Sequence, residues 1–245
     1  MRIDCFAQTD VGPVRTYNED GYAFDARTGL YAVFDGMGGQ SSGVVAVEIA
    51  TRELRAFADE LPGIAATHHE LEERARTLLQ RINRGIQEDQ TKYRTAYGTT
   101  AVLLAIGTNE ALVAHVGDSR AYRWREGSFE QMTDDHSLVA EVRRSGEVPP
   151  GYSLEQIAEQ FANVITRCVG YGSELLVDTR IEELHPRDAW LLCSDGLWRA
   201  LANDAIAEEL DDESDPSSVC RALVERALAR GAEDNVTAMV VTARR

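Results

Sequence analysis

The sequence predicts an α+β fold in which two antiparallel sheets pack together and pairs of helices lie outside them. The order of the elements favours this class, because the apolar patterns give strands, two helices, strands, two helices and a final strand. That order lacks the strand–helix alternation of a parallel doubly wound sheet. No Pro/Gly/Ser-rich linker and no repeat of fixed period divides the chain, so we expect a single domain over residues 1–245.

The N-terminal half predicts three strands followed by two helices. Short apolar segments separated by turn residues are typical of strands, and they occur at 3–8, 21–25 and 30–35. From Gly43 the apolar residues recur every three or four positions, as they do on one face of a helix. The two predicted helices cover 43–61 and 69–90, and Pro62-Gly63 ends the first of them.

The rest of the chain predicts mainly strands, with one helix at 137–144 and two helices before the last strand. The final helix has Asp215 as its N-cap, Pro216 at its first position and Gly231 just past its end. The segment 146–162 is less regular and is interpreted as an insertion or flap. The predicted strands cover 99–106, 111–116, 120–125, 164–167, 179–184, 189–194 and 236–242.

The composition is that of a globular protein with a strong acidic excess. Asp and Glu number 41 against 25 Lys and Arg, so the formal net charge is −16. This balance disfavours nucleic acid and anionic membranes as partners, since both need a basic face. No apolar run approaches the ~18 residues of a membrane span, and the N-terminus has no apolar signal region. We therefore expect a cytoplasmic protein without membrane insertion.

Other features of the composition favour no particular site. Lys92 is the only lysine and no G-x-x-x-x-G-K-[ST] motif is present, which makes kinase chemistry a weak hypothesis. The four cysteines have no C-x-x-C or zinc-like spacing and are interpreted as reduced thiols. The acidic stretch 204–215 is interpreted as solvated surface, with an exposed turn at 211–214.

Three apolar strands end in an aspartate beside a glycine. The pairs are Asp35-Gly36, Gly117-Asp118 and Asp195-Gly196, and Asp234 directly precedes the last strand. Each pair alone is ordinary turn chemistry. Strand ends at one edge of a sheet can converge on one cleft, however, and Mg²⁺ and Mn²⁺ prefer carboxylate ligands. The pattern therefore indicates a divalent-metal site as an alternative to separate turns.

Arg15 lies in a polar segment directly before a predicted strand. The planar guanidinium binds two phosphate oxygens at once, so an arginine near a carboxylate-rich metal site suits a phosphate ligand. Taken by itself, Arg15 is better explained as a surface residue in a polar turn.

Ordered motifs run along nearly the whole chain. They are VRTYNED (14–20), VFDGMGG (33–39), YGTTA (97–101), HVGDSRAY (115–122), DDHSLV (134–139), VITRCVG (164–170), LLCSDGLW (191–198) and DNVTAMVV (234–241). Together they resemble the bacterial-type metal-dependent Ser/Thr protein phosphatases of the protein phosphatase 2C-like (PPM) family. The resemblance implies a four-layer α-β-β-α sandwich with its metal cleft at one edge of the sheets. It also implies a flap subdomain at about 135–166 beside that cleft.

The resemblance implies Mn²⁺ or Mg²⁺ as the cofactor, with two ions in a core site and a third ion beside it. Asp35 would bridge the two core ions, with the Gly36 carbonyl on one of them. Asp195 and Asp234 would complete the shell of the other core ion. Asp118 would hold the third ion together with Asp195.

The implied reaction is hydrolysis of phosphoserine and phosphothreonine by direct attack of a metal-bridging hydroxide, without a covalent phosphoenzyme. Arg15 would bind the substrate phosphate, and Glu19 and Asp20 would hold metal-bound waters, so Arg15 and Asp20 join Asp35 as catalytic residues. Met37 stands where animal members carry a histidine that is the usual general acid. The leaving group would then take its proton from another source, such as metal-bound water. His136 is a conceivable acid, although a structural role near the flap is favoured.

The implied partners are phosphorylated proteins, including a bacterial Ser/Thr kinase and its targets, and we expect a monomer. A second hypothesis is a catalytically silent relative used as a binding module. Such proteins usually lose a metal aspartate or the phosphate-binding arginine, and this chain keeps both kinds of residue. A metal-dependent nuclease could use the same carboxylates, but the acidic charge disfavours it and no motif supports it.

Overall fold

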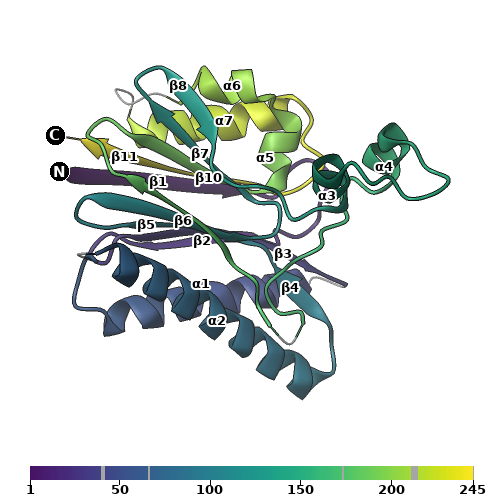
Figure 1. Ribbon diagram of the computed structural model, residues 1–245, viewed down its shortest axis with the longest axis horizontal. Helices are drawn as coiled ribbons and strands as arrows, with labels where there is room; N and C mark the ends of the chain where they lie inside the picture. The colour runs from purple at the N-terminus through teal and green to yellow at the C-terminus, as the bar shows by residue number, and fades with distance from the viewer. Residues whose placement is uncertain (40–41, 66, 173, 211–214, 245) are drawn as a thin grey trace.

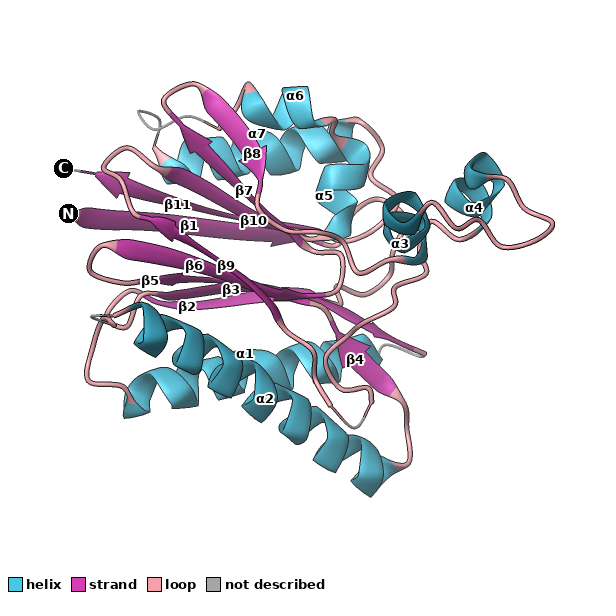
Figure 2. Cartoon of the chain, viewed as in Figure 1, coloured by secondary structure: helices cyan, strands magenta, loops and turns pink. Residues whose placement is uncertain are grey.

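Two antiparallel β-sheets pack face to face and helices cover the outer face of each (Figures 1 and 2). The computed structural model describes residues 1–39, 42–65, 67–172, 174–210 and 215–244. The predicted α+β sandwich with four layers is confirmed. None of the helices in the described part of the chain has the length and apolar character that crossing a membrane requires.

The first sheet contains the first and the last strand of the chain, which pair with each other. In spatial order its strands are β1 (Arg2–Asp10), β11 (Val236–Arg244), β10 (Ala189–Cys193), β7 (Arg120–Arg125) and β8 (Ser128–Gln131). Its outer face carries the short helices α5 (Asp195–Ala200) and α6 (Asn203–Ala207) and the longer α7 (Pro216–Ala229). Asp215 caps α7 by accepting a hydrogen bond from the Ser218 backbone N–H, as the sequence predicts.

The second sheet lies against the two long helices. In spatial order its strands are β2 (Asp20–Asp25), β3 (Leu30–Gly38), β5 (Ala101–Ile106), β6 (Glu110–Val116) and β9 (Asp178–Glu183), and the short β4 (Tyr97–Thr99) pairs with the end of β3. Helices α1 (Ser42–Glu60) and α2 (His68–Tyr93) cover its outer face.

Side-chain alternation along the strands explains why the molecule has four layers. In β10, Trp190 and Leu192 pack in the core between the sheets, whereas Ala189, Leu191 and Cys193 pack against the helices. Both faces of the strand are therefore buried, which accounts for its continuous apolar sequence. The four cysteines are free thiols, as predicted from their spacing.

The region between α3 (Leu138–Ser145) and β9 differs from the prediction. Residues 164–167 form no strand, because only Ile165 makes an isolated bridge, to Ser137. The segment interpreted as irregular contains helix α4 (Leu154–Gln160), which begins with a capping box between Ser153 and Gln156. Helices α3 and α4 project beyond the edge of the sandwich (Figure 1).

Several short elements also differ from the prediction. The predicted strand at 99–106 divides into β4 and β5, and β8 was not predicted. Among the described residues, three helices and not two lie between β10 and β11, because α5 and α6 are too short to show a helical period. Asp195 begins α5 and does not occupy a turn. The exposed turn predicted at 211–214 lies outside the described residues.

Candidate metal centre

The predicted metal ligands come together in one cavity of about 230 Å³. It opens at the edge of the sandwich where β3 and β6 end, β10 leads into α5, and β11 begins. The predicted ligands that line it are Asp35, Gly36, Asp118, Asp195 and Asp234, together with Arg15 and Glu19. The strand ends thus converge on one cleft, as the sequence pattern indicated.

Asp35 lies where β3 changes its pairing partner from β5 to β4, and backbone hydrogen bonds hold it there. Its backbone N–H donates to Thr100 Oγ1 at 3.1 Å, and its carbonyl accepts from the Thr100 backbone N–H at 2.8 Å. The carbonyl also accepts from Thr99 Oγ1 at 3.0 Å. At this point β3 leaves β5 and pairs with β4. These backbone contacts fix the direction of the Asp35 carboxylate at the cavity wall.

Asp195 and Asp234 are brought together by a close approach of two backbones. A Cβ atom on Gly196 would lie 2.1 Å from the Asn235 carbonyl oxygen, so the start of α5 can approach the start of β11 only with glycine at this position. Asp35 lines the same cavity as these two aspartates. Three of the predicted ligands therefore adjoin one another.

Asn235 is a residue whose role the sequence did not reveal. Its Nδ2 donates to the carbonyls of Val11 and Tyr17, and its Oδ1 accepts from the Glu19 backbone N–H at 2.8 Å. These three bonds attach the segment carrying Arg15 to the start of β11. Asn235 is only 4% exposed, and a buried amide side chain is normally fully hydrogen-bonded.

The two acids predicted to hold waters occupy different positions. Glu19 lines the cavity, and its Oε1 accepts from the Gly43 backbone N–H at 2.9 Å. Asp20 is buried and does not line the cavity; its Oδ2 accepts from Ser194 Oγ at 2.6 Å and from Thr237 Oγ1 at 2.7 Å. Burial raises the pKa of Asp20 to about 7, although these two hydrogen bonds oppose the rise.

The carboxylates repel one another in this confined space. Burial raises the pKa of Asp35 well above its usual range, and the charges of Asp20, Asp195, Asp118 and Asp234 raise it further. Burial, followed by the charge of Asp195, raises the pKa of Asp118 to about 6. A divalent cation bound among these groups would offset the repulsion between the carboxylates and the cost of burying their negative charge.

Two arginines pair with the acids. Arg15 Nη2 donates to Asp234 Oδ2 at 2.5 Å. Arg199, which sequence reasoning missed, donates from Nε to Asp195 Oδ2 at 2.9 Å and from Nη2 to Asp118 Oδ2 at 3.2 Å. Its spacing of four residues from Asp195 on a helix is the signal that could have revealed it.

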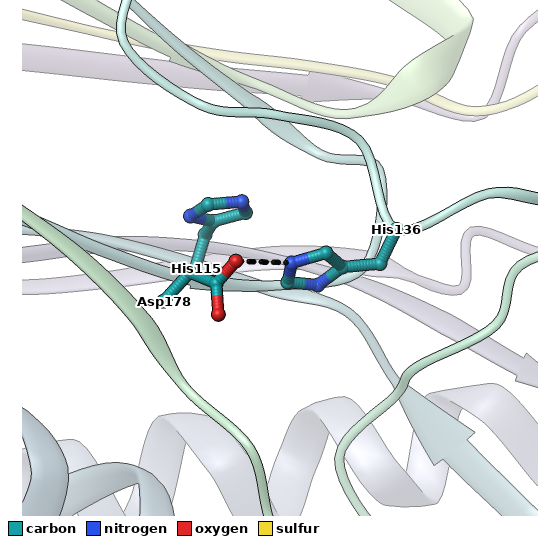
Figure 3. Close-up of side chains that lie close together, drawn as sticks. All are labelled: His115, His136 and Asp178. Carbon is teal, nitrogen blue, oxygen red and sulfur yellow. Dashed lines mark hydrogen bonds and ion pairs between the residues drawn. The ribbon is translucent and has the colours of Figure 1, made fainter. Parts of the chain in front are cut away.

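His136 lies away from this cavity, in a cluster with His115 and Asp178 (Figure 3). His136 is 2% exposed; its Nδ1 accepts from the Gly117 backbone N–H at 3.1 Å, and its Nε2 lies 3.1 Å from Asp178 Oδ2. Burial lowers its pKa to about 4. With both ring nitrogens engaged, His136 fits the structural role and not the role of general acid.

The same cluster does not favour a second metal site. His115, His136 and Asp178 offer ligand atoms within 4.8 Å of one another. The Arg167 guanidinium, however, donates to Asp178 Oδ1 at 2.9 Å and lies 3.3 Å from His136 Nε2. A positive charge already lies beside the carboxylate, and a metal ion would have to displace it.

The donor set of the cavity fits a hard divalent ion. It consists of the four aspartate carboxylates and the Gly36 carbonyl, all of them oxygen ligands of the kind that Mg²⁺ and Mn²⁺ prefer. An arginine at the rim can bind an anion such as phosphate. The arrangement therefore suits metal-assisted chemistry on a phosphorylated substrate.

Comparison with known proteins identifies the family. The family model described as Protein phosphatase 2C matches residues 17–236. The chain belongs to the protein phosphatase 2C family. Membership confirms the resemblance stated above and makes the chain a metal-dependent Ser/Thr protein phosphatase.

Individual members of the protein phosphatase 2C family cover the chain almost completely. The serine/threonine phosphatase stp of Listeria monocytogenes is 32% identical over 239 residues, which are 96% of this chain and 93% of that protein. PppA, described as a key regulatory component of T6SS in Pseudomonas aeruginosa, has a TM-score of 0.85 at 35% identity and covers 99% of this chain and 98% of its own. A catalytic domain of PstP in complex with two manganese ions has a TM-score of 0.85 at 30% identity, with 99% of both chains covered.

Proposed function

We propose that this protein hydrolyses phosphoserine and phosphothreonine in proteins by direct attack of an activated water on phosphorus, without a covalent intermediate. The observation that carries the proposal is the convergence of Asp35, Asp118, Asp195 and Asp234, from four separate segments of the chain, on one cavity with Arg15 at its wall. Acids gathered in this way attract phosphate only after cations neutralise them.

We assign two divalent ions, Mn²⁺ or Mg²⁺, to the core of this cavity. When bound, such a pair activates water and offsets the charge that develops on the phosphoryl oxygens. Asp35 would hold both ions, the Gly36 carbonyl would be a ligand of one, and Asp195 and Asp234 would be ligands of the other. Glu19 and Asp20 would orient waters at the ions, with Asp20 acting from its buried position outside the cavity lining.

Arg15 binds and orients the substrate phosphate. Its pairing with Asp234 keeps the guanidinium at the cavity, where its remaining N–H groups can donate to phosphoryl oxygens. Met37 also lines the cavity but carries no exchangeable proton. We therefore assign protonation of the leaving alkoxide to water in the cleft.

A third ion would use Asp118 and Asp195, and Arg199 competes with it. The guanidinium bonds both carboxylates and also donates to the Ala162 carbonyl, in the segment predicted as the flap. A cation bound at this pair must displace at least part of these charge-assisted hydrogen bonds. The third ion is consequently bound more weakly than it would be without Arg199.

Replacing Arg199 with alanine is expected to strengthen binding of the third Mn²⁺ by about tenfold, because a charge-assisted hydrogen bond contributes about 1.5–3 kcal/mol. Calorimetric titration counts the ions and measures each affinity. Arg226→Ala is the matched control, since Arg226 pairs with Glu208 and Glu209 instead. An unchanged third affinity in Arg199→Ala would contradict the competition.

The biological setting is proposed from the family and the sequence. We propose a cytoplasmic monomer that opposes a bacterial Ser/Thr kinase by dephosphorylating the kinase or its targets. A catalytically silent binding module is less well supported, since Arg15 and every predicted metal aspartate lie in place at the cavity.

The test of the proposed function is phosphate release from a phosphothreonine peptide. We expect turnover with Mn²⁺, loss of activity on adding EDTA, and recovery when excess Mn²⁺ is restored, because Asp35, Asp195 and Asp234 act through the ions they hold. Activity that survives complete chelation would exclude this function, and metal binding without any turnover would favour the silent module.

A further inference from the structure

A second cavity, of about 490 Å³, adjoins the metal centre. We call it the apolar cavity; the apolar side chains that line it are Met37, Val116, Ile165, Leu175 and Leu176, together with Cys168. Its volume falls in the range of small-ligand sites, about 300–1,000 Å³, and is ample for one large side chain with its backbone. Its lining residues come from β3, the end of β6 and the segments 165–172 and 174–176.

The apolar cavity shares part of its wall with the cavity of the metal centre. Met37 and Ile165 line both. Met37 directly follows Gly36 and comes two positions after Asp35, so the shared wall lies next to the proposed metal ligands. A peptide whose phosphate lies at Asp35 must pass Met37 with the residues on one side of the phosphorylated position.

Two polar side chains in the wall of the apolar cavity are already bonded elsewhere. Arg167 donates to Asp178 Oδ1 at 2.9 Å, and Thr166 Oγ1 donates to Glu141 Oε1 at 2.6 Å. The guanidinium is thus neutralised by a carboxylate and is poorly placed to select a second phosphate or an acidic side chain. The rest of the wall is mainly apolar, and it also contains Tyr171 and the carboxylate of Glu174.

Large apolar side chains are also exposed at the rim. Leu176 is 57% exposed and Tyr171 is 44% exposed, and both line the apolar cavity. Single exposed apolar residues need no explanation, but a group of them around a cavity marks a site that binds an apolar partner.

We propose that the apolar cavity binds an apolar side chain close to the phosphorylated residue of the protein substrate. The inference rests on the proposed function and narrows its substrate class to phosphoproteins with a large aliphatic or aromatic residue near the phosphoserine or phosphothreonine. Met37 then separates the two cavities and contacts the substrate at the position where animal relatives carry a histidine.

The experiment compares two phosphothreonine peptides that differ only in the flanking residues, leucine in one and aspartate in the other. We expect kcat/KM to be about tenfold higher for the leucine peptide, the effect of burying one aliphatic side chain. p-Nitrophenyl phosphate, which has no flanking residues, reports the chemistry alone. Leu176→Asp should remove the peptide preference and leave hydrolysis of p-nitrophenyl phosphate unchanged.

Val148→Asp is the matched control, because Val148 is an exposed apolar residue that does not line the apolar cavity. Equal rates for the two peptides, or a preference that Leu176→Asp leaves intact, would overturn the inference while the phosphatase assignment stands. A change from dimer to monomer in Leu176→Asp would assign the cavity to a second copy of the chain and also overturn it. Failure to hydrolyse every phosphorylated compound would overturn the proposed function itself.

Discussion

Replacing Asp35 with asparagine is expected to reduce phosphatase activity by a factor on the order of 10³, because the proposed bridging ligand loses its charge and one of its two equivalent oxygens. The substitution conserves size and leaves the backbone bonds to Thr99 and Thr100 in place. The measurement is phosphate release from a phosphothreonine peptide with saturating Mn²⁺.

Thermal unfolding separates this effect from loss of the fold. Burial and four neighbouring charges raise the pKa of Asp35 in the folded protein, so its ionised form at pH 7 costs stability in the metal-free state. The midpoint of unfolding of metal-free Asp35→Asn should therefore be no lower than that of the wild type. Asp204→Asn, a substitution of an exposed acid outside the cavity, should keep full activity. Wild-type activity in Asp35→Asn would exclude Asp35 as a ligand.

Replacing Gly36 with alanine is expected to destabilise the protein by about 3 kcal/mol and to inactivate it. An added Cβ would lie 2.5 Å from the carbonyl oxygens of both Glu19 and Gly43. Both contacts are with backbone, so no side-chain rotation can relieve them. The end of β3, the start of α1 and the segment before β2 would all have to separate, and the Asp35 carboxylate would move with them.

Gly39→Ala is the matched control, because a Cβ there meets no atom within 4 Å. Urea denaturation of the metal-free proteins measures the difference in the free energy of unfolding. If Gly36→Ala unfolds at the same urea concentration as Gly39→Ala, the prediction that backbone contacts exclude a Cβ at position 36 is contradicted.

The sequence predicted those parts of the fold that rest on local patterns. Alternation and apolar runs located the strand that carries Asp35 and the strand that ends shortly before Asp118, and the caps at Asp215 and Gly231 located α7. Short elements such as α5 and α6 were missed or merged because a helix of five or six residues completes too few turns to show a period. Helix α4 had a readable signal, the Ser153–Gln156 capping box, but the prolines before it dominated the interpretation.

Sequence reasoning likewise located some residues of the candidate site and missed others. The aspartates could be located because each lies beside an apolar strand, and the ordered motifs then gave each one an implied role. Arg199 and Asn235 could not be located, since their importance comes from contacts across the fold, with Asp118 and with the segment 11–19. The apolar cavity was likewise hidden, because Met37 and Leu176 are ordinary apolar residues until the chain brings them together.

The central claim is that the acids of one cleft hold the ions that carry out the hydrolysis. It is tested most directly by titrating the metal-free protein with Mn²⁺ while bound ions and phosphate released from a phosphothreonine peptide are measured on the same samples. We predict that phosphate release begins only as the core pair of ions binds, and that Asp35→Asn shows neither the pair nor the activity. Full activity in samples without bound ions, or two tight ions in Asp35→Asn, would contradict the claim.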